Sequence, residues 1–267
     1  MSEAAGNIEP IRPDTDEFLL AIRRAEESEA RAAALIHALQ QTLIPPTPPH
    51  VPGLDVAAVY RPAVGEVGGD FYDVFEVADG DWCVVIGDVS GKGTDAAIVT
   101  STARHVVRSS ALRHPEPSDL LRVLNAALVE HPTTRFCTVA LVRLRSRDGV
   151  WVAALTSGGH PFPILTRHGS ATKLGKPGSL LGLFHNVEFH DVSIKLAKGD
   201  ALVLYTDGVV EGRNDADEFY GEDRLQHVLT GPAISAQTMA DQAVADVMAF
   251  QSSQARDDIA LVVIRNP

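Results

Sequence analysis

The chain has 267 residues, of which 45% are hydrophobic and 22% are charged, a balance that is ordinary for a globular protein with a buried core. Its 35 acidic and 23 basic residues give a formal charge of −12, which argues against a nucleic-acid-binding protein because phosphates need a basic surface. No apolar run reaches the roughly 18 residues that span a bilayer, and residues 1–13 lack the pattern of a signal peptide. We therefore expect a cytoplasmic protein with no membrane contact, in which Cys83 and Cys137 are buried, reduced thiols.

A long helix is expected over residues 14–44, after a disordered segment at 1–13. Asp14 followed by Glu17 is typical of a capped helix N-terminus, and apolar residues then recur at alternating spacings of four and three. This spacing fits a coiled coil that pairs two copies of the chain or carries a regulatory signal, and it also fits a helix packed on its own domain. Prolines in the connector at 45–53 end the helix, because proline lacks the amide donor.

The main domain is expected to span residues 54–267, where short strands and tight turns follow one another. Strands are expected at Leu54–Arg61, Phe71–Val77, Trp82–Asp88, Phe136–Arg145, Val150–Thr156, around Ile164, at Val187–Lys195, at Ala201–Thr206 and at Ile259–Ile264. Helices are expected at Thr94–Leu112, Ser118–His131, Glu222–Leu229 and Ser235–Gln251. Because the strands cluster instead of alternating strictly with helices, the pattern favours an α+β fold with antiparallel sheets.

Aspartates stand at the ends of four apolar strands of this domain. Asp70 opens one strand, Asp88 and Asp207 close two others, and the pair Asp257-Asp258 opens the last. One such aspartate is usually a turn or cap residue, but four in one domain favour a shared role. If the carboxylates converge, their repulsion requires a counter-charge, and oxygen ligands select hard cations such as Mg²⁺ or Mn²⁺. The residues alone predict a carboxylate–metal site and leave its chemistry open.

Seven short motifs occur in one order along the chain. They are Leu39-Gln40-Gln41-Thr42-Leu43-Ile44-Pro45-Pro46, Val67-Gly68-Gly69-Asp70-Phe71-Tyr72-Asp73, Gly87-Asp88-Val89-Ser90-Gly91-Lys92-Gly93, Gly158-Gly159-His160-Pro161, Leu181-Gly182-Leu183, Tyr205-Thr206-Asp207-Gly208-Val209-Val210-Glu211 and Asp257-Asp258. In these motifs the chain resembles the metal-dependent protein phosphatases (the phosphatase 2C-like family), in the bacterial branch typified by the stage II sporulation phosphatase and the stress-sigma-factor regulator phosphatases. The resemblance covers about residues 39–265. It implies a four-layer sandwich of two antiparallel β-sheets flanked by α-helices, preceded by an N-terminal linker helix.

The resemblance also implies a centre of two divalent cations, Mn²⁺ or Mg²⁺, between the sheets. The implied ligands are Asp88 as the bridging carboxylate, the backbone carbonyl of Val89, Asp207 and Asp257 at the first metal, Asp70 at the second, and Asp258 as the alternative to Asp257. Asp88 and Asp207 are the implied catalytic residues, and a metal-activated water attacks phosphoserine or phosphothreonine without a phosphoenzyme. The eukaryotic relatives carry a histidine just after the bridging aspartate, where Val89-Ser90 stands here, so the general acid is unassigned.

Two further residues have two readings each. Lys92 in the glycine loop either attracts the substrate phosphate or is a solvated loop lysine. His160 either anchors the turn before Pro161 or lies near the substrate.

By resemblance, the substrate is a phosphorylated anti-anti-sigma (STAS-type) protein in a partner-switching pathway that controls a sigma factor. The expected partners also include an upstream sensor or activator protein, and a homodimer through the N-terminal helix. The alternatives are a catalytically silent scaffold that binds signalling partners, and an unrelated metal phosphohydrolase that acts on small molecules.

Overall fold

The computed structural model describes most of the chain. The described residues are 20, 23–24, 47–63, 68–130, 135–231, 234–252 and 255–267. The helix expected over 14–44 therefore lies outside the described residues, except for three positions, as does the start of the connector at 45–53. Within the described part of the chain, no helix is long and apolar enough to cross a bilayer.

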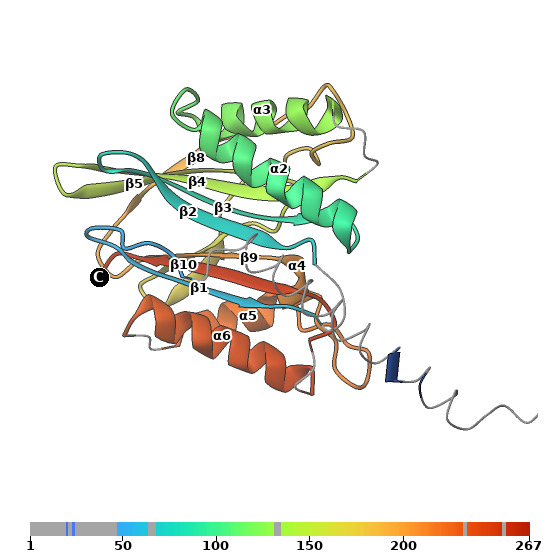
Figure 1. Cartoon of the computed structure of the whole chain (residues 1–267). Helices are drawn as coiled ribbons and strands as arrows, with labels where there is room; N and C mark the ends of the chain where they lie inside the picture. Colours follow the sequence, from blue (N-terminus) through green and yellow to red (C-terminus); the bar gives the residue numbers. More distant parts are fainter. Residues whose placement is uncertain are drawn as a thin grey trace, which may run out of the picture.

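Two five-stranded antiparallel sheets face each other (Figure 1). Sheet A contains, in spatial order, β1 (Asp55–Arg61), β10 (Ile259–Arg265), β9 (Ala201–Tyr205), β6 (Ile164–Arg167) and β7 (Ser170–Lys173). Sheet B contains β2 (Phe71–Ala78), β3 (Asp81–Val89), β4 (Cys137–Arg147), β5 (Val150–Gly158) and β8 (Val192–Leu196). The first strand of sheet A pairs with the last strand of the chain, from Asp55 opposite Arg265 to Arg61 opposite Ile259.

Helices cover the outer face of each sheet, which completes four layers (Figure 1). Sheet B is covered by α2 (Thr94–Ser110) and α3 (Pro117–Glu130), and sheet A by α5 (Glu222–Leu229) and α6 (Ala236–Phe250). A short helix, α4 (Asp207–Val210), follows β9 after a single residue, Thr206. The α+β sandwich expected from the sequence is confirmed.

The direction of each strand side chain follows from the two-residue period of a β-strand. In β3, Val84 and Ile86 pack between the sheets against residues such as Leu204, whereas Cys83 and Val85 pack under α2 and α3. The inner faces are therefore apolar over most of their length. Asp88 continues the series of Val84 and Ile86, so the strand directs its carboxylate into the space between the sheets.

Three local features differ from the sequence prediction. The strand β7 was not expected, because its side chains are mostly exposed and show no apolar alternation. The four-residue α4 was not expected either. The strand expected over Val187–Lys195 begins only at Val192, because Asp191 instead accepts hydrogen bonds from the amide (2.9 Å) and hydroxyl (2.7 Å) of Ser118 in the first turn of α3.

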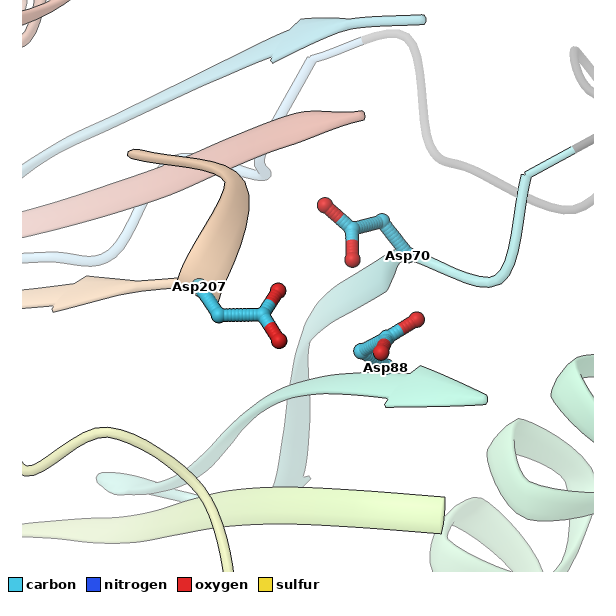
Figure 2. A group of neighbouring side chains, drawn as sticks. All are labelled: Asp70, Asp88 and Asp207. Atoms are coloured by element: carbon cyan, nitrogen blue, oxygen red, sulfur yellow. The ribbon is translucent and has the colours of Figure 1, made fainter. Parts of the chain in front are cut away.

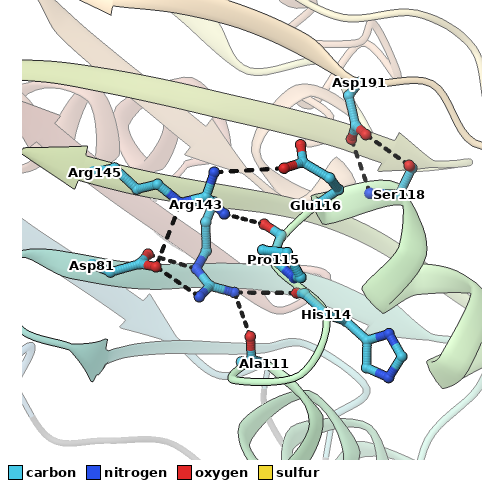
Figure 3. Close-up of polar contacts among 9 residues, drawn as sticks. All are labelled: Asp81, Ala111, His114, Pro115, Glu116, Ser118, Arg143, Arg145 and Asp191. Atoms are coloured by element: carbon cyan, nitrogen blue, oxygen red, sulfur yellow. Dashed lines mark hydrogen bonds and ion pairs between the residues drawn. The ribbon is translucent and has the colours of Figure 1, made fainter.

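A buried arginine fixes the turn between α2 and α3 to sheet B (Figure 3). Arg143 of β4 is 2% exposed and donates to both carboxylate oxygens of Asp81, at 2.7 and 2.9 Å. It also donates to the carbonyls of Ala111 (2.7 Å) and His114 (3.3 Å), just beyond the end of α2. The neighbouring Arg145 donates to Asp81 and to the Pro115 carbonyl. These bonds satisfy carbonyls that the helix itself leaves without donors.

Candidate metal centre

Three carboxylates converge between the sheets at one end of the sandwich. Asp70, Asp88 and Asp207 each offer one oxygen, and these oxygens all lie within 4.8 Å of one another. Figure 2 shows the three side chains directed toward a common space. Asp70 directly precedes β2 and Asp88 lies in β3, whereas Asp207 begins α4, one residue after β9. Both sheets therefore contribute to the cluster.

The cluster is electrostatically unfavourable by itself. Burial, followed by the charges of Asp207 and Asp257, raises the pKa of Asp88 to about 7. Burial and the charge of Asp88 raise the pKa of Asp70, and burial together with Glu211 raises that of Asp207. A divalent cation would offset this repulsion, and a set of carboxylate oxygens suits Mg²⁺ or Mn²⁺. The residues present therefore fit the cations that the sequence predicts.

A hydroxyl from sheet A holds Asp70 in place. The Thr206 hydroxyl donates to Oδ2 of Asp70 at 2.6 Å and accepts from the Ala260 amide at 3.0 Å. Thr206 is fully buried and lies between β9 and Asp207. One residue thus orients a carboxylate of sheet B and precedes a carboxylate of sheet A. Thr206 was not singled out as a site residue from the sequence.

Glycine at position 69 gives the backbone room to approach the cluster. A Cβ at Gly69 would lie 2.6 Å from an oxygen of Asp88 and closer still to the carbonyl oxygen of Val89. The Gly69 carbonyl itself accepts from the Val89 amide at 3.2 Å. Because residue 69 has no side chain, its backbone can lie against both the Asp88 carboxylate and the carbonyl of Val89, a ligand implied by the resemblance.

The structure distinguishes Asp257 from Asp258, although both stand outside the group of three. Asp258 is 3% exposed and accepts hydrogen bonds from the Tyr60 hydroxyl (3.0 Å) and the Ala63 amide (2.7 Å). The side chain of Asp257 is 60% exposed and lies 3.0 Å from the ammonium of Lys92. Hydrogen-bond donors of the protein itself thus engage the Asp258 carboxylate, whereas Asp257 lies at the solvent-exposed rim of the cluster.

Lys92 is held at the same rim by the loop that follows β3. The Ser90 amide donates to the Phe136 carbonyl at 2.9 Å, and Arg135 donates to the Ser90 carbonyl at 2.8 Å. These bonds fix the residues just before Lys92. Arg135 could not be singled out from the sequence, because its partner is a backbone atom 45 positions away.

His160, in the turn after β5 of sheet B, is buried and only 4% exposed. Its backbone bonds at both ends with the Ser157 hydroxyl, which closes the turn after β5. Nδ1 of its ring lies 2.8 Å from the Thr138 hydroxyl oxygen. Burial lowers the pKa of His160 to about 3, and the backbone of Tyr205 opposes the shift. The imidazole is therefore neutral near pH 7.

Comparison with known families supports the expectation drawn from the motifs. The sequence model of the Stage II sporulation protein E (SpoIIE) family matches residues 78–267. The phosphoserine phosphatase RsbU of Bacillus subtilis is 27% identical over 248 residues, which cover 92% of this chain and 72% of RsbU. Protein IcfG of Synechocystis is 29% identical over 220 residues, which cover 72% of this chain but only 34% of IcfG. The chain thus spans about a third of the length of that relative.

Solved structures agree on the fold. The PP2C domain of SiaA from Pseudomonas aeruginosa superposes with a TM-score of 0.73 at 20% identity, covering 92% of this chain and 98% of that domain. A structure of the RsbU and RsbW domains of a Mycobacterium tuberculosis protein gives a TM-score of 0.68 at 27% identity, covering 83% of this chain and 62% of that one. With its fold and the extent of the family match, the chain belongs to the stage II sporulation protein E (SpoIIE) family, whose fold is that of the PP2C phosphatases.

Proposed function

We propose that the protein is a metal-dependent serine/threonine protein phosphatase of the RsbU and SpoIIE type. The observation that carries the proposal is the convergence of Asp70, Asp88 and Asp207 within 4.8 Å, from both sheets, in a chain of this family. The raised pKa values of these carboxylates are consistent with a cation site.

Two divalent cations, Mn²⁺ or Mg²⁺, are the proposed cofactors. Asp88 would bridge them, and the Val89 carbonyl would add a backbone ligand. Asp207 and Asp257 would hold one cation and Asp70 the other. Asp258 would lie behind these ligands, where its carboxylate accepts hydrogen bonds from the Tyr60 hydroxyl and the Ala63 amide. When bound, such a pair of cations activates a water and neutralises charge on a phosphoryl group.

The chain's own residues would orient this centre and receive the substrate. Thr206 holds one oxygen of Asp70, so that carboxylate meets a cation in a fixed direction. Lys92 lies beside Asp257 at the rim, where a substrate phosphate would approach, and its ammonium would attract that phosphate. His160 is too deeply buried to meet a phosphoprotein, so we assign it no substrate contact.

The proposed substrate is a phosphoserine or phosphothreonine residue of an anti-anti-sigma (STAS-type) protein. The motif resemblance supports this class, and so do the name of RsbU, a phosphoserine phosphatase, and the structure in which RsbU and RsbW domains occur together. An upstream sensor or activator protein, and pairing of two copies through residues 14–44, are further parts of the proposal. The phosphatase unit would be residues 54–267.

Phosphate release from a phosphoserine STAS-type protein, with and without Mn²⁺, tests the function. We expect manganese-dependent turnover in the wild type and a loss of at least about a hundredfold in Asp207→Asn, because a ligand of the reacting centre is removed. Asp241→Asn is the matched control, since Asp241 is exposed on α6 and bonds only locally to Gln237 among the described contacts. Faster release from nucleotides than from the phosphoprotein would favour a small-molecule phosphohydrolase. Absence of Mn²⁺ binding in calorimetry would favour a silent scaffold.

A further inference from the structure

The peptide between Val89 and Ser90 is held on one side by the residues that lead into β4. The Ser90 amide donates to the Phe136 carbonyl at 2.9 Å. The described part of the chain contains no cis peptide bond, so the Val89 carbonyl points in the opposite direction to the amide hydrogen of the same planar peptide. The hydrogen bond to Phe136 therefore turns the Val89 carbonyl away from β4.

This orientation brings the Val89 carbonyl to the carboxylate cluster. A Cβ at Gly69 would lie 2.6 Å from an oxygen of Asp88 and closer still to the carbonyl oxygen of Val89, so both oxygens border the same small space. The amide of Val89 donates to the Gly69 carbonyl at 3.2 Å. Hydrogen bonds on both sides thus set the direction of the carbonyl that the proposed function assigns as a backbone ligand.

The amide, hydroxyl and carbonyl of Ser90 all bond to residues 135 and 136. Besides the amide bond to Phe136, the Ser90 hydroxyl accepts from the Phe136 amide at 3.1 Å, and the Ser90 carbonyl accepts from Nη1 of Arg135 at 2.8 Å. The direction of each bond is unambiguous, because backbone amides and a guanidinium can only donate. The guanidinium also covers Gly91, where a Cβ would overlap Nη1.

We propose that Arg135 is a positioning residue for the metal centre, which holds Ser90 so that the Val89 carbonyl faces a cation. Phe136 fixes the peptide before Ser90, and Arg135 fixes the peptide after it. Ser90 therefore cannot rotate about its own backbone bonds without breaking one of these contacts. The inference rests on the proposed function, because it concerns a ligand assigned there. Outer contacts of this kind orient metal ligands, and their loss typically weakens metal binding about 10–100-fold.

Mn²⁺ affinity measured by calorimetry on the full chain tests the inference without reference to turnover. Arg135→Met keeps the aliphatic stem and removes the donor to the Ser90 carbonyl, so we expect Mn²⁺ binding about tenfold weaker. Ser90→Ala removes the acceptor of the Phe136 amide and should weaken binding by less. Arg135→Lys keeps a donor and the charge and should recover part of the loss.

The sign of the change separates positioning from simple electrostatics. Removing a positive charge near a cation site favours cation binding, so an Arg135 that acted only through its charge would give tighter Mn²⁺ binding in Arg135→Met. Arg122→Met is the matched control, because Arg122 of α3 also donates to a backbone carbonyl, that of Phe189, at 3.3 Å. It should bind Mn²⁺ as the wild type does.

Denaturant unfolding in EDTA identifies a role of Arg135 that is limited to stabilising the loop. Arg135→Met would then lower the free energy of unfolding and keep the wild-type Mn²⁺ affinity, and this result, or tighter binding, would overturn the inference. If Arg135→Met does not fold, Ser90→Ala and Ser109→Ala carry the comparison, since the exposed Ser109 hydroxyl donates to the Val106 carbonyl within α2. Equal Mn²⁺ affinities in these two variants would again overturn it. A wild type that binds no Mn²⁺ would overturn the proposed function itself.

Discussion

The hydroxyl of Thr206 lies 2.6 Å from Oδ2 of Asp70, a contact between residues 136 positions apart that joins the two sheets at the carboxylate cluster. The same hydroxyl accepts from the Ala260 amide. Through these two bonds, the end of β9 fixes both the start of β10 and a carboxylate of the opposite sheet.

Thr206→Val should weaken both the fold and the metal site. It leaves the buried Ala260 amide without its acceptor, which costs about 1–3 kcal/mol in free energy of unfolding, and it releases Asp70. Denaturant unfolding in EDTA measures the first effect, and calorimetric Mn²⁺ titration the second. Thr206→Ser keeps the hydroxyl and should restore most of both. Wild-type Mn²⁺ affinity in Thr206→Val would show that Asp70 needs no orientation.

In the metal-free protein, the stability contributed by the carboxylate cluster should fall as the pH rises from about 4 to about 7, against an opposite contribution from His160, whose pKa is lowered to about 3 by burial. Burial and neighbouring charges raise the pKa of Asp88 to about 7 and those of Asp70 and Asp207 above their ordinary value, whereas an unfolded aspartate has a pKa of about 3.9. The folded state therefore holds more protons in this range, and stability falls as they dissociate. Melting temperatures in EDTA across this range measure the slope.

Bound Mn²⁺ should reverse that slope, because a cation competes with protons for the same oxygens. The melting temperature should gain more from Mn²⁺ at neutral than at acidic pH. Asp88→Asn should flatten the EDTA slope, and the exposed Asp241→Asn should leave it unchanged. An EDTA slope identical in Asp88→Asn and wild type would contradict the assignment of the shifted pKa to this cluster.

Asp257→Ala and Asp258→Ala should separate metal binding from stability. Asp258 has protein donors at Tyr60 and Ala63, so its removal leaves the Ala63 amide without an acceptor and costs about 1–3 kcal/mol in EDTA. The side chain of Asp257 is 60% exposed. Its removal should therefore change the unfolding free energy little and should weaken Mn²⁺ binding instead. The two variants are each other's control. If Asp258→Ala weakened Mn²⁺ binding and Asp257→Ala lowered the stability instead, Asp258 would be the ligand and Asp257 the structural residue.

Arg143→Met should destabilise the helical layer over sheet B without altering the metal site. The variant leaves Asp81 and the carbonyls of Ala111 and His114 without their buried donor, and loss of one partner of such a pair costs about 3–5 kcal/mol. Arg145→Met is the comparison, because Arg145 is 25% exposed and should cost less. Calorimetry below the melting temperature should give unchanged Mn²⁺ affinity in both.

The fold and the carboxylate cluster could be predicted from the sequence to the extent that they depend on patterns within single strands. Strand alternation places Ile86 and Asp88 on one face, and a charge that continues an apolar series indicates a buried site. The same period would have separated Asp257 from Asp258, since Asp258 shares the face of Ala260 and Val262 in the inter-sheet core.

The residues that the sequence did not reveal act through distant partners. Thr206, Thr138 and Tyr60 are ordinary strand residues, and only the folded chain brings them to Asp70, His160 and Asp258. Arg143 stands in an alternating strand where a charged side chain indicates a solvent-facing position. Its burial depends on the carbonyls of the α2–α3 turn, which no local pattern encodes.

The pairing of β1 with β10 has a consequence for the order of assembly. During synthesis, sheet B is complete once residue 196 has been made, and with it Asp70 and Asp88. Sheet A joins residue 55 to residue 265, and β10 lies between β1 and β9, so sheet A cannot be completed before β10 has been made. Contacts so distant in sequence form slowly. The proposed cation site draws on both sheets and so would close only once β10 has been made, and a chain that stops before residue 259 would carry the proposed ligands in a site it cannot close.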